Sequence, residues 1–243
     1  MKDLLIKSIK DLNFIAIIAI ALWCNAVNNF ADFDFWSRLY CGLAYINNGW
    51  ILTQDIFAFA ETKAYWVDHE WLSGIIFFLI FKQFGSFGIL LLKWSVVITC
   101  ITFIYLCLRL RNDSNINIIY LFIILFGIET AFLSNIRPHI FTYVFFCIWL
   151  FILEYSRLNN SFKYLYILPL SIVLWVNLHA GCIAGIALCC VYALSQIIEK
   201  KEYKYYIIVA VVSVLLMLIN PYGYNYFGYI LAELAAEHNN ISE

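Results

Sequence analysis

Residues 88–108 read GILLLKWSVVITCITFIYLCL, and this stretch decides what kind of protein the chain can be. An apolar run of this length is what an α-helix needs to cross the hydrocarbon core of a bilayer. The rest of the chain has the same character, because 64% of its 243 residues are hydrophobic and only 13% are charged. A soluble domain of this length could not bury so much apolar surface, so the solvent of this protein is a membrane.

The apolar runs are continuous rather than alternating, which indicates membrane helices and not the strands of a barrel. We predict an all-α, polytopic transmembrane helix bundle of about seven spans that forms one domain over residues 1–243. The predicted spans are residues 14–27, 88–108, 116–133, 140–153, 165–178, 181–198 and 205–219. An eighth stretch, Trp71 to Phe84, is shorter, so it either crosses or lies as a tilted interfacial helix at the end of the first outer loop, residues 28–71.

The distribution of Lys and Arg decides between these alternatives, because short cytoplasmic loops carry the excess of positive charge. If Trp71 to Phe84 does not cross, the cytoplasmic side receives Lys2, Lys7, Lys10, Arg109, Arg111, Arg157, Lys163, Lys200, Lys201 and Lys204. If it does cross, all of these after Lys10 move to the other side. The charge bias favours the non-crossing topology, with a cytoplasmic N-terminus and an uncleaved first helix.

This topology gathers the polar islands of the chain on the non-cytoplasmic face. In the first outer loop, Asp32 and Asp34 lie directly beyond a membrane helix and are flanked by aromatic residues. Two such acids suit a general base, or a metal-mediated ligand for a polyanionic headgroup. The alternative is that they only solvate a loop whose tryptophans form an interfacial aromatic belt.

A second island of this loop is Asp68-His69-Glu70. His-Glu begins the HExxH motif of zinc proteases, but Ser73 stands where the second His is needed, which excludes that class. The three side chains can still contribute to a metal site, although three adjacent residues cannot all face one ion from a regular helix. The cofactor is therefore unknown from the sequence, with a divalent cation as one option.

Further islands lie at the ends of membrane helices. Arg137 runs against the positive-inside trend, which an anion such as a lipid phosphate or a carboxylate would explain. The structural alternative is an ion pair with one of the acids of the same face: Asp32, Asp34 or Glu129. His139, Asn177 and His179 lie at the same face, where a single such residue is more often a helix stop or a packing residue than a site.

Taken in order, the islands resemble a family of bacterial membrane proteins related to the GT-C glycosyltransferases, which use polyprenyl-phosphate-linked sugars. The shared pattern is DxDxWxxLxxG at residues 32–42, WxxHEWL at 66–72, RPxxF at 137–141, WxNLH at 175–179 and NPYG at 220–223. Two positions depart from it, because Arg38 stands where His is expected and Ala180 where Gly is expected. The resemblance covers roughly residues 28–225.

The resemblance implies inverting sugar transfer from a polyprenyl-phosphate donor on the non-cytoplasmic face of a bacterial cytoplasmic membrane. Asp34 or Asp32 would be the catalytic base that deprotonates the acceptor. Arg137 would bind the lipid phosphate, whose negative charge grows in the transition state. The other substrate-binding residues would be His139, His179, His69, Glu70 and Asn177.

The main departure from this family is length, since GT-C-like enzymes continue through more membrane helices. We therefore expect a missing C-terminal domain or a companion chain beside the lipid partners. The rival classes are a transporter and a lipid-binding or structural membrane subunit without catalysis. A transporter should carry charges near the bilayer midplane, and the sequence shows no clear one. The formal net charge of -1 and the lack of a basic arm argue against a nucleic-acid partner.

Overall fold

The computed structural model describes residues 14–16, 18–23, 26, 33–49, 51–59, 65–111 and 135–235. The predicted span 116–133, Asp32 and Glu129 lie outside these residues. Within them the chain forms helices joined by turns and no β-strand, which confirms the all-α prediction.

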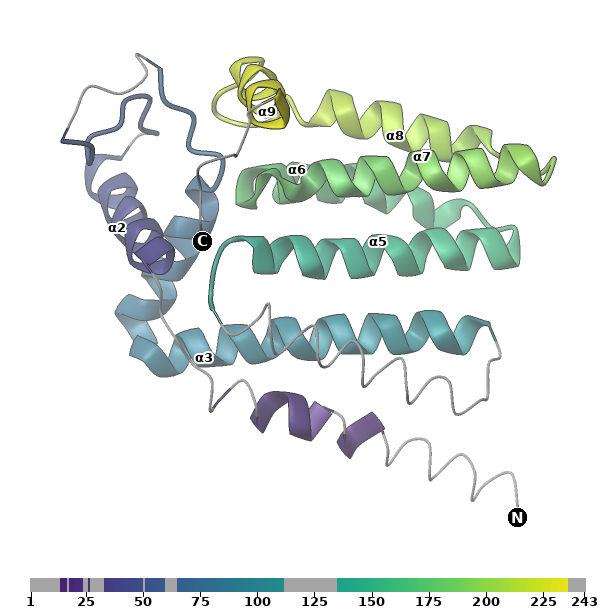
Figure 1. Cartoon of the computed structure of the whole chain (residues 1–243), viewed down its shortest axis with the longest axis horizontal. Helices are drawn as coiled ribbons and strands as arrows, with labels where there is room; N and C mark the ends of the chain where they lie inside the picture. Colours follow the sequence, from purple (N-terminus) through teal and green to yellow (C-terminus); the bar gives the residue numbers. More distant parts are fainter. Residues whose placement is uncertain are drawn as a thin grey trace.

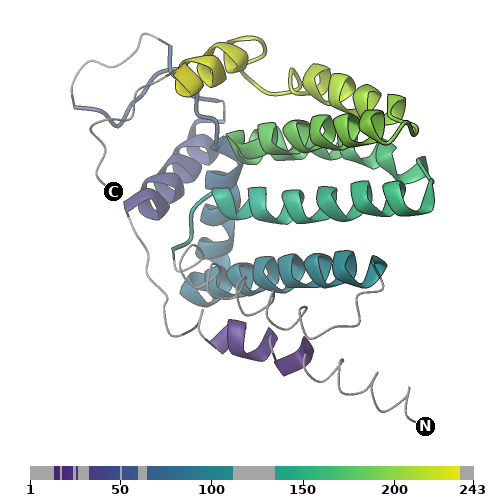
Figure 2. The same ribbon diagram turned by 45° about the vertical axis from the view of Figure 1, so that its right-hand side comes forward.

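The labelled helices follow one another in a simple order along the chain. They are α2 (Phe33–Asn48), α3 (Trp71–Leu110), α5 (His139–Asn159), η1 (Lys163–Tyr166), α6 (Ile167–Leu178), η2 (Ala180–Cys182), α7 (Ile183–Ile198), α8 (Lys204–Leu216) and α9 (Asn225–Ala235). Figure 1 shows the second part of α3 running side by side with α5, α6, α7 and α8. In Figures 1 and 2, α2, α9 and the first part of α3 gather at one end of this bundle.

The helices α5, α6, α7 and α8 run in alternating directions, and the two ends of the bundle that they form carry different side chains. The end where α5 and α7 begin and α6 and α8 end is called the polar end here, because it carries the predicted site residues (Figure 1). The opposite end is called the basic end, because α3, α5 and α7 finish there close to Arg111, Arg157 and Lys200.

Three described helices are long and apolar enough to cross a membrane: Trp71–Leu110, His139–Asn159 and Ala180–Ile198. The apolar helices over Lys163–Leu178 and Lys204–Leu216 are shorter, and Phe14–Trp23 is described only in part. The structure therefore supports a membrane protein, while the count of seven spans stays a prediction.

Helix α3 is divided by a kink at Gly85, whose φ of 59° and ψ of -152° are not helical. This backbone region is open essentially to glycine alone. A straight helix of 40 residues would measure about 60 Å, about twice the thickness of a hydrocarbon core. The kink sends the stretch Trp71 to Phe84 away from the common direction of the bundle, as a separate arm at the polar end (Figure 1).

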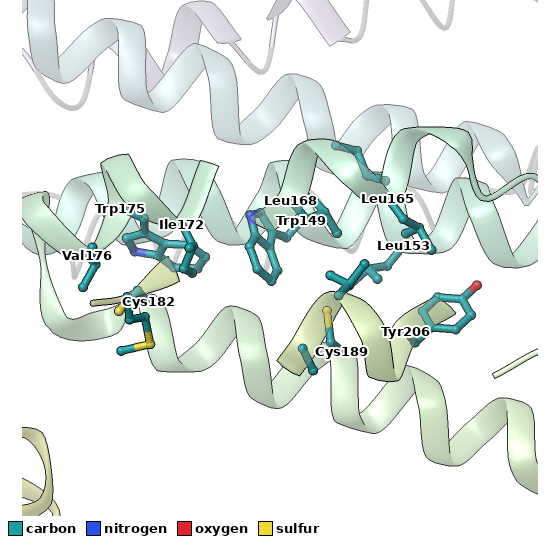
Figure 3. Packing of buried hydrophobic residues seen from close by; sticks show 14 of the residues in the cluster. Trp149, Leu153, Leu165, Leu168, Ile172, Trp175, Val176, Cys182, Cys189 and Tyr206 are labelled. Atoms are coloured by element: carbon teal, nitrogen blue, oxygen red, sulfur yellow. The ribbon is translucent and has the colours of Figure 1, made fainter. Parts of the chain in front are cut away.

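The largest core cluster joins α5, α6, α7 and α8. Trp149 of α5 and Trp175 of α6 are fully buried and pack edge to face with ring centroids 5.6 Å apart (Figure 3). Their indole N–H groups are satisfied inside the protein, because Trp149 donates to Ser171 Oγ at 2.8 Å and Trp175 donates to Thr142 Oγ1 at 3.0 Å. Large apolar side chains remain exposed around this core, as expected for helices that face lipid.

Lys93 changes the expectation about charges inside the spans. It belongs to predicted span 88–108, about 8 Å along the helix from Gly88, and only 1% of it is exposed. Ionisable residues within membrane helices face the protein interior and mark a pair or a function. The bundle therefore holds a buried lysine inside a predicted span.

Helices α2 and α3 cross with their backbones in contact at two glycines. A Cβ atom added to Gly42 would lie 2.1 Å from the carbonyl oxygen of Gly74, and one added to Gly74 would lie 2.7 Å from the carbonyl oxygen of Arg38. Both obstacles are backbone atoms, so a methyl group at either position forces the two helices apart.

We therefore expect Gly42→Ala to lower the free energy of unfolding by about 1–3 kcal/mol, the usual cost of overpacking. Thermal unfolding of the purified protein in detergent measures this change. Gly228→Ala in α9 is the matched control, because a Cβ there meets nothing within 4 Å and alanine favours the helix. Equal unfolding temperatures for the two variants would contradict the close contact.

Candidate functional site

The carboxylate of Asp68 is a buried anchor between α2 and the loop before α3. Its Oδ1 accepts a hydrogen bond from the Arg38 guanidinium and another from the backbone N–H of Glu70 at 3.1 Å. Its Oδ2 accepts from the hydroxyl of Tyr45 at 2.6 Å, and the side chain is 0% exposed. A buried carboxylate with this many short bonds holds structure together and is closed to ligands.

The guanidinium of Arg38 supplies the positive charge that this anchor needs. Burial alone would lower the pKa of Arg38, but the neighbouring acidic groups, with Asp68 the largest of them, together outweigh burial and raise that pKa above its ordinary value. Arg38 is thus charged at every relevant pH. The unexpected residue of the first motif therefore has a defined role in tying α2 to the loop.

Glu70, two residues further on, differs from Asp68 in the length of its contacts. His69 Nε2 lies 3.3 Å and His179 Nε2 lies 3.4 Å from its Oε1, and Arg38 Nε lies 3.6 Å from its Oε2. Burial would raise the pKa of Glu70, but His69, Arg38 and His179 together lower it below the ordinary value. The group is therefore an ionised carboxylate whose neighbours stand just outside close hydrogen-bonding distance.

The ring of His179 has a defined tautomer. The backbone N–H of Gly181 donates to its Nδ1 at 2.9 Å, and an N–H group can only donate, so Nδ1 carries no proton. Thr142 Oγ1 lies 2.9 Å from the same nitrogen and receives the indole N–H of Trp175, which leaves its own hydrogen for Nδ1. Burial lowers the pKa of His179 to about 4. At neutral pH the ring is uncharged and presents Nε2–H to Glu70.

Three histidines predicted as substrate-binding residues come together at the polar end. The ring centroid of His179 lies 6.1 Å from that of His69 and 6.4 Å from that of His139. On its other side, His69 stacks on Tyr229 of α9 with centroids 4.7 Å apart and an interplanar angle of 19°. Residues from the first outer loop, from the start of α5, from the turn after α6 and from α9 thus lie together; His179 is the residue that directly follows α6.

Asp34 and Arg137 form a second polar pair at the same end. Arg137 Nη1 lies 3.3 Å from Asp34 Oδ2, and the two side chains are 30% and 56% exposed. Asp34 belongs to the first turn of α2, and Arg137 lies two residues before the start of α5. Among the partners proposed for Arg137, Asp34 is therefore one that the structure places in contact, whereas Asp32 lies outside the described residues.

Asn177 has a mainly structural set of contacts. Its Oδ1 accepts from the indole N–H of Trp71 at 2.9 Å, and its Nδ2 donates to the carbonyl oxygens of Val173 at 2.7 Å and Ile219 at 3.0 Å. Both amide hydrogens are used. A substrate that accepts a hydrogen bond from the Asn177 amide would therefore have to replace one of these two bonds.

Ser73, the residue that excludes the zinc-protease motif, is also structural. It is buried and donates its hydroxyl hydrogen to the carbonyl oxygen of Leu178 at 2.6 Å. Among the described residues, no group of three or more His, Cys, Asp or Glu side chains is placed to hold a metal ion. A divalent cation therefore has no support from this part of the chain.

Sequence reasoning missed Thr142, Tyr229 and the anchoring role of Tyr45. Thr142 could have been found, because it follows His139 by three positions and so lies on the same face of a helix. Tyr229 carries no such signal, since its place beside His69 results from the packing of α9.

Comparison of the chain with known protein families, with characterised proteins and with solved structures finds no match.

The fold and the site define a helical membrane protein whose polar end gathers carboxylate, imidazole and guanidinium groups.

The stability of the folded protein at low pH should depend on His179, because the fold favours the neutral ring and lowers the pKa of His179 to about 4. A lowered histidine pKa stabilises the folded protein above about pH 6.5, and this stabilisation is lost as the pH falls toward 4.

We expect the unfolding temperature of the wild-type protein to fall across this interval and the fall to be smaller in His179→Asn. Asparagine keeps a hydrogen-bond acceptor near Nδ1 but does not titrate. Thermal scans in detergent between pH 7.5 and 4.5 measure both curves. Parallel curves for the two proteins would show that His179 does not control the acid response.

Proposed function

We propose that the chain is a GT-C-type membrane glycosyltransferase, which transfers a sugar from a polyprenyl-phosphate donor to an acceptor on the non-cytoplasmic face. The observation that carries the proposal is the contact of 3.3 Å between Asp34 and Arg137. It sets a half-exposed carboxylate, open to an acceptor, beside a guanidinium that suits a phosphate. The motif resemblance of the sequence supports the same reaction.

In this reaction, the hydroxyl oxygen of the acceptor attacks the anomeric carbon of the donor sugar, and Asp34 takes the hydroxyl proton. The bond from that carbon to the phosphate oxygen breaks, and its electron pair stays on the phosphate. Arg137 stabilises the charge that grows there. Asp68 cannot be the base, because its carboxylate is buried and saturated with hydrogen bonds.

The proposed topology places the polar end outside and the N-terminus in the cytoplasm. The positive-inside rule supports it, because Arg111, Arg157 and Lys200 lie at the basic end. At this end α3, α5 and α7 finish and η1 and α8 begin (Figure 1). In this arrangement the arm from Trp71 to Phe84 lies along the outer membrane surface. Its divergence from the bundle at Gly85 supports that position.

A transporter is the second candidate function, and Lys93 is the observation that favours it. A buried ionisable residue within a membrane helix is typical of ion and substrate pathways. A lipid-binding or structural subunit without catalysis is the remaining alternative. Loss of Asp34 distinguishes these classes from the enzyme. Only an enzyme whose first outer loop performs the chemistry needs the Asp34 carboxylate for turnover.

The topology can be tested with single cysteines in a variant that lacks the native ones. Tyr224, which follows α8 at the polar end, and Lys201, which follows α7 at the basic end, are both exposed. In intact cells, a membrane-impermeant maleimide should label Tyr224→Cys at once and Lys201→Cys only after permeabilisation. Labelling of both positions from the same side would contradict the topology.

For catalysis, we expect Asp34→Asn to lower turnover by about a hundredfold to ten-thousandfold, the usual contribution of a general base. Donor binding and membrane insertion should stay near the wild-type level. Arg137→Ala should instead weaken donor binding, because the phosphate charge is present in the ground state and in the transition state. The assay measures sugar transfer and lipid binding with a polyprenyl-phosphate-linked sugar.

Glu199→Gln is the matched control, because Glu199 is exposed at the basic end and pairs with Lys201. It should leave both turnover and donor binding unchanged. If Asp34→Asn, Asp32→Asn and the double variant all keep full turnover, the first outer loop is not catalytic. The transporter or structural alternative would then be favoured.

A further inference from the structure

Two carboxylates that lie two residues apart in one loop, Asp68 and Glu70, differ in what they can bind. Asp68 accepts hydrogen bonds from Arg38, Tyr45 and the backbone of Glu70, and it is closed to solvent. The carboxylate of Glu70 is partly exposed, and its nearest donors lie 3.3 to 3.6 Å away. Glu70 is therefore partly open to solvent and lacks a close hydrogen bond to these neighbours, so its carboxylate can accept shorter hydrogen bonds from a ligand.

The groups around Glu70 restrict the charge of that ligand. The guanidinium of Arg38 beside Oε2 disfavours a cation, and the ionised carboxylate itself disfavours an anion. His179 presents a neutral Nε2–H, since its Nδ1 is occupied by Gly181 and Thr142. A neutral ligand with hydroxyl groups fits, because it can donate to the carboxylate and accept from the imidazole.

The stacked rings of His69 and Tyr229 add an aromatic surface next to this carboxylate. Tyr229 is only partly buried, so one side of the pair can contact a ligand. Ligand sites commonly combine such apolar surface with a few polar groups that fix orientation. A sugar ring has both halves of the matching chemistry, with apolar C–H faces and hydroxyls around its edge.

We propose that Glu70, His69, His179 and Tyr229 form a hydroxyl-binding subsite that takes the sugar ring of the lipid-linked donor. The inference rests on the proposed function, since that function supplies the sugar. It adds a division of labour in which Arg137 binds the phosphate and the Glu70 group binds the sugar. His139 links the two parts, because it follows Arg137 by two residues and its ring lies 6.4 Å from that of His179.

Equilibrium binding to the full chain in lipid nanodiscs tests this division. The probes are undecaprenyl phosphate and the same lipid phosphate carrying glucose, mannose or arabinose. The wild-type protein should bind at least one sugar-bearing probe more tightly than the bare lipid. Glu70→Gln should remove about tenfold or more of that advantage, as expected for the loss of a charge-assisted hydrogen bond, and leave affinity for the bare lipid unchanged.

A second variant, Tyr229→Leu, keeps an apolar side chain on α9 but removes the aromatic surface. It should reduce the same advantage for sugar-bearing probes while preserving the thermal stability of the protein. Arg137→Ala should weaken binding of every probe alike, because all of them carry the phosphate. Glu199→Gln, at the opposite end of the bundle, should bind each probe as the wild type does.

Several results would overturn the subsite. Equal wild-type affinity for bare and sugar-bearing lipids would do so, as would a Glu70→Gln variant that binds all probes normally. An equal loss for the bare lipid in Glu70→Gln would assign Glu70 to the phosphate or to the fold. In these cases binding of the bare lipid would leave the proposed function intact. Absence of wild-type binding to all four lipids would instead overturn the proposed function itself.

Discussion

The burial of the Asp68 carboxylate is the constraint on which the polar end depends. A charge removed from water destabilises a protein unless it is paired and hydrogen-bonded, so Asp68 can lie here only with Arg38 and Tyr45 in place. Those two residues belong to α2, which is also held against α3 by the contact between Gly42 and Gly74. Together these interactions determine where the loop ends and α3 begins.

The position of the candidate site follows from that anchor. Because Asp68 is fixed by its hydrogen bonds, His69 and Glu70 lie at the start of α3. There they contact His179, which directly follows α6. His179 is oriented in turn by a backbone amide of the following turn and by Thr142, which Trp175 holds from the buried core. The site is thus supported by both the loop anchor and the aromatic core of the bundle. Such support limits how far the imidazole and carboxylate groups can move relative to each other.

The opposite end of the bundle is held by a different set of charges. Glu154 of α5 is nearly fully buried and accepts from Arg111 at 2.7 Å, from Arg157 at 2.8 Å and from the hydroxyl of Tyr192 at 2.8 Å. These contacts join the end of α3 to α5 and α7. Between the two ends the outer surface is apolar, with exposed side chains such as Leu170 and Val191. The bundle is therefore polar at its ends and apolar around its sides, as a bilayer requires.

The sequence by itself determined the helical membrane class, because the length and hydrophobicity of a run such as 88–108 are local properties that require no knowledge of packing. It also identified the polar islands, and with them His69, Glu70, His139 and His179. Only the tertiary structure decided that Asp68 is a hydrogen-bonded anchor while Glu70 stays partly exposed, since their partners lie as far as 30 and 109 residues away along the chain. Tyr229 and the burial of Lys93 escaped the sequence for the same reason: hydropathy adds up along a segment, whereas hydrogen bonds and burial depend on which distant segments pack together.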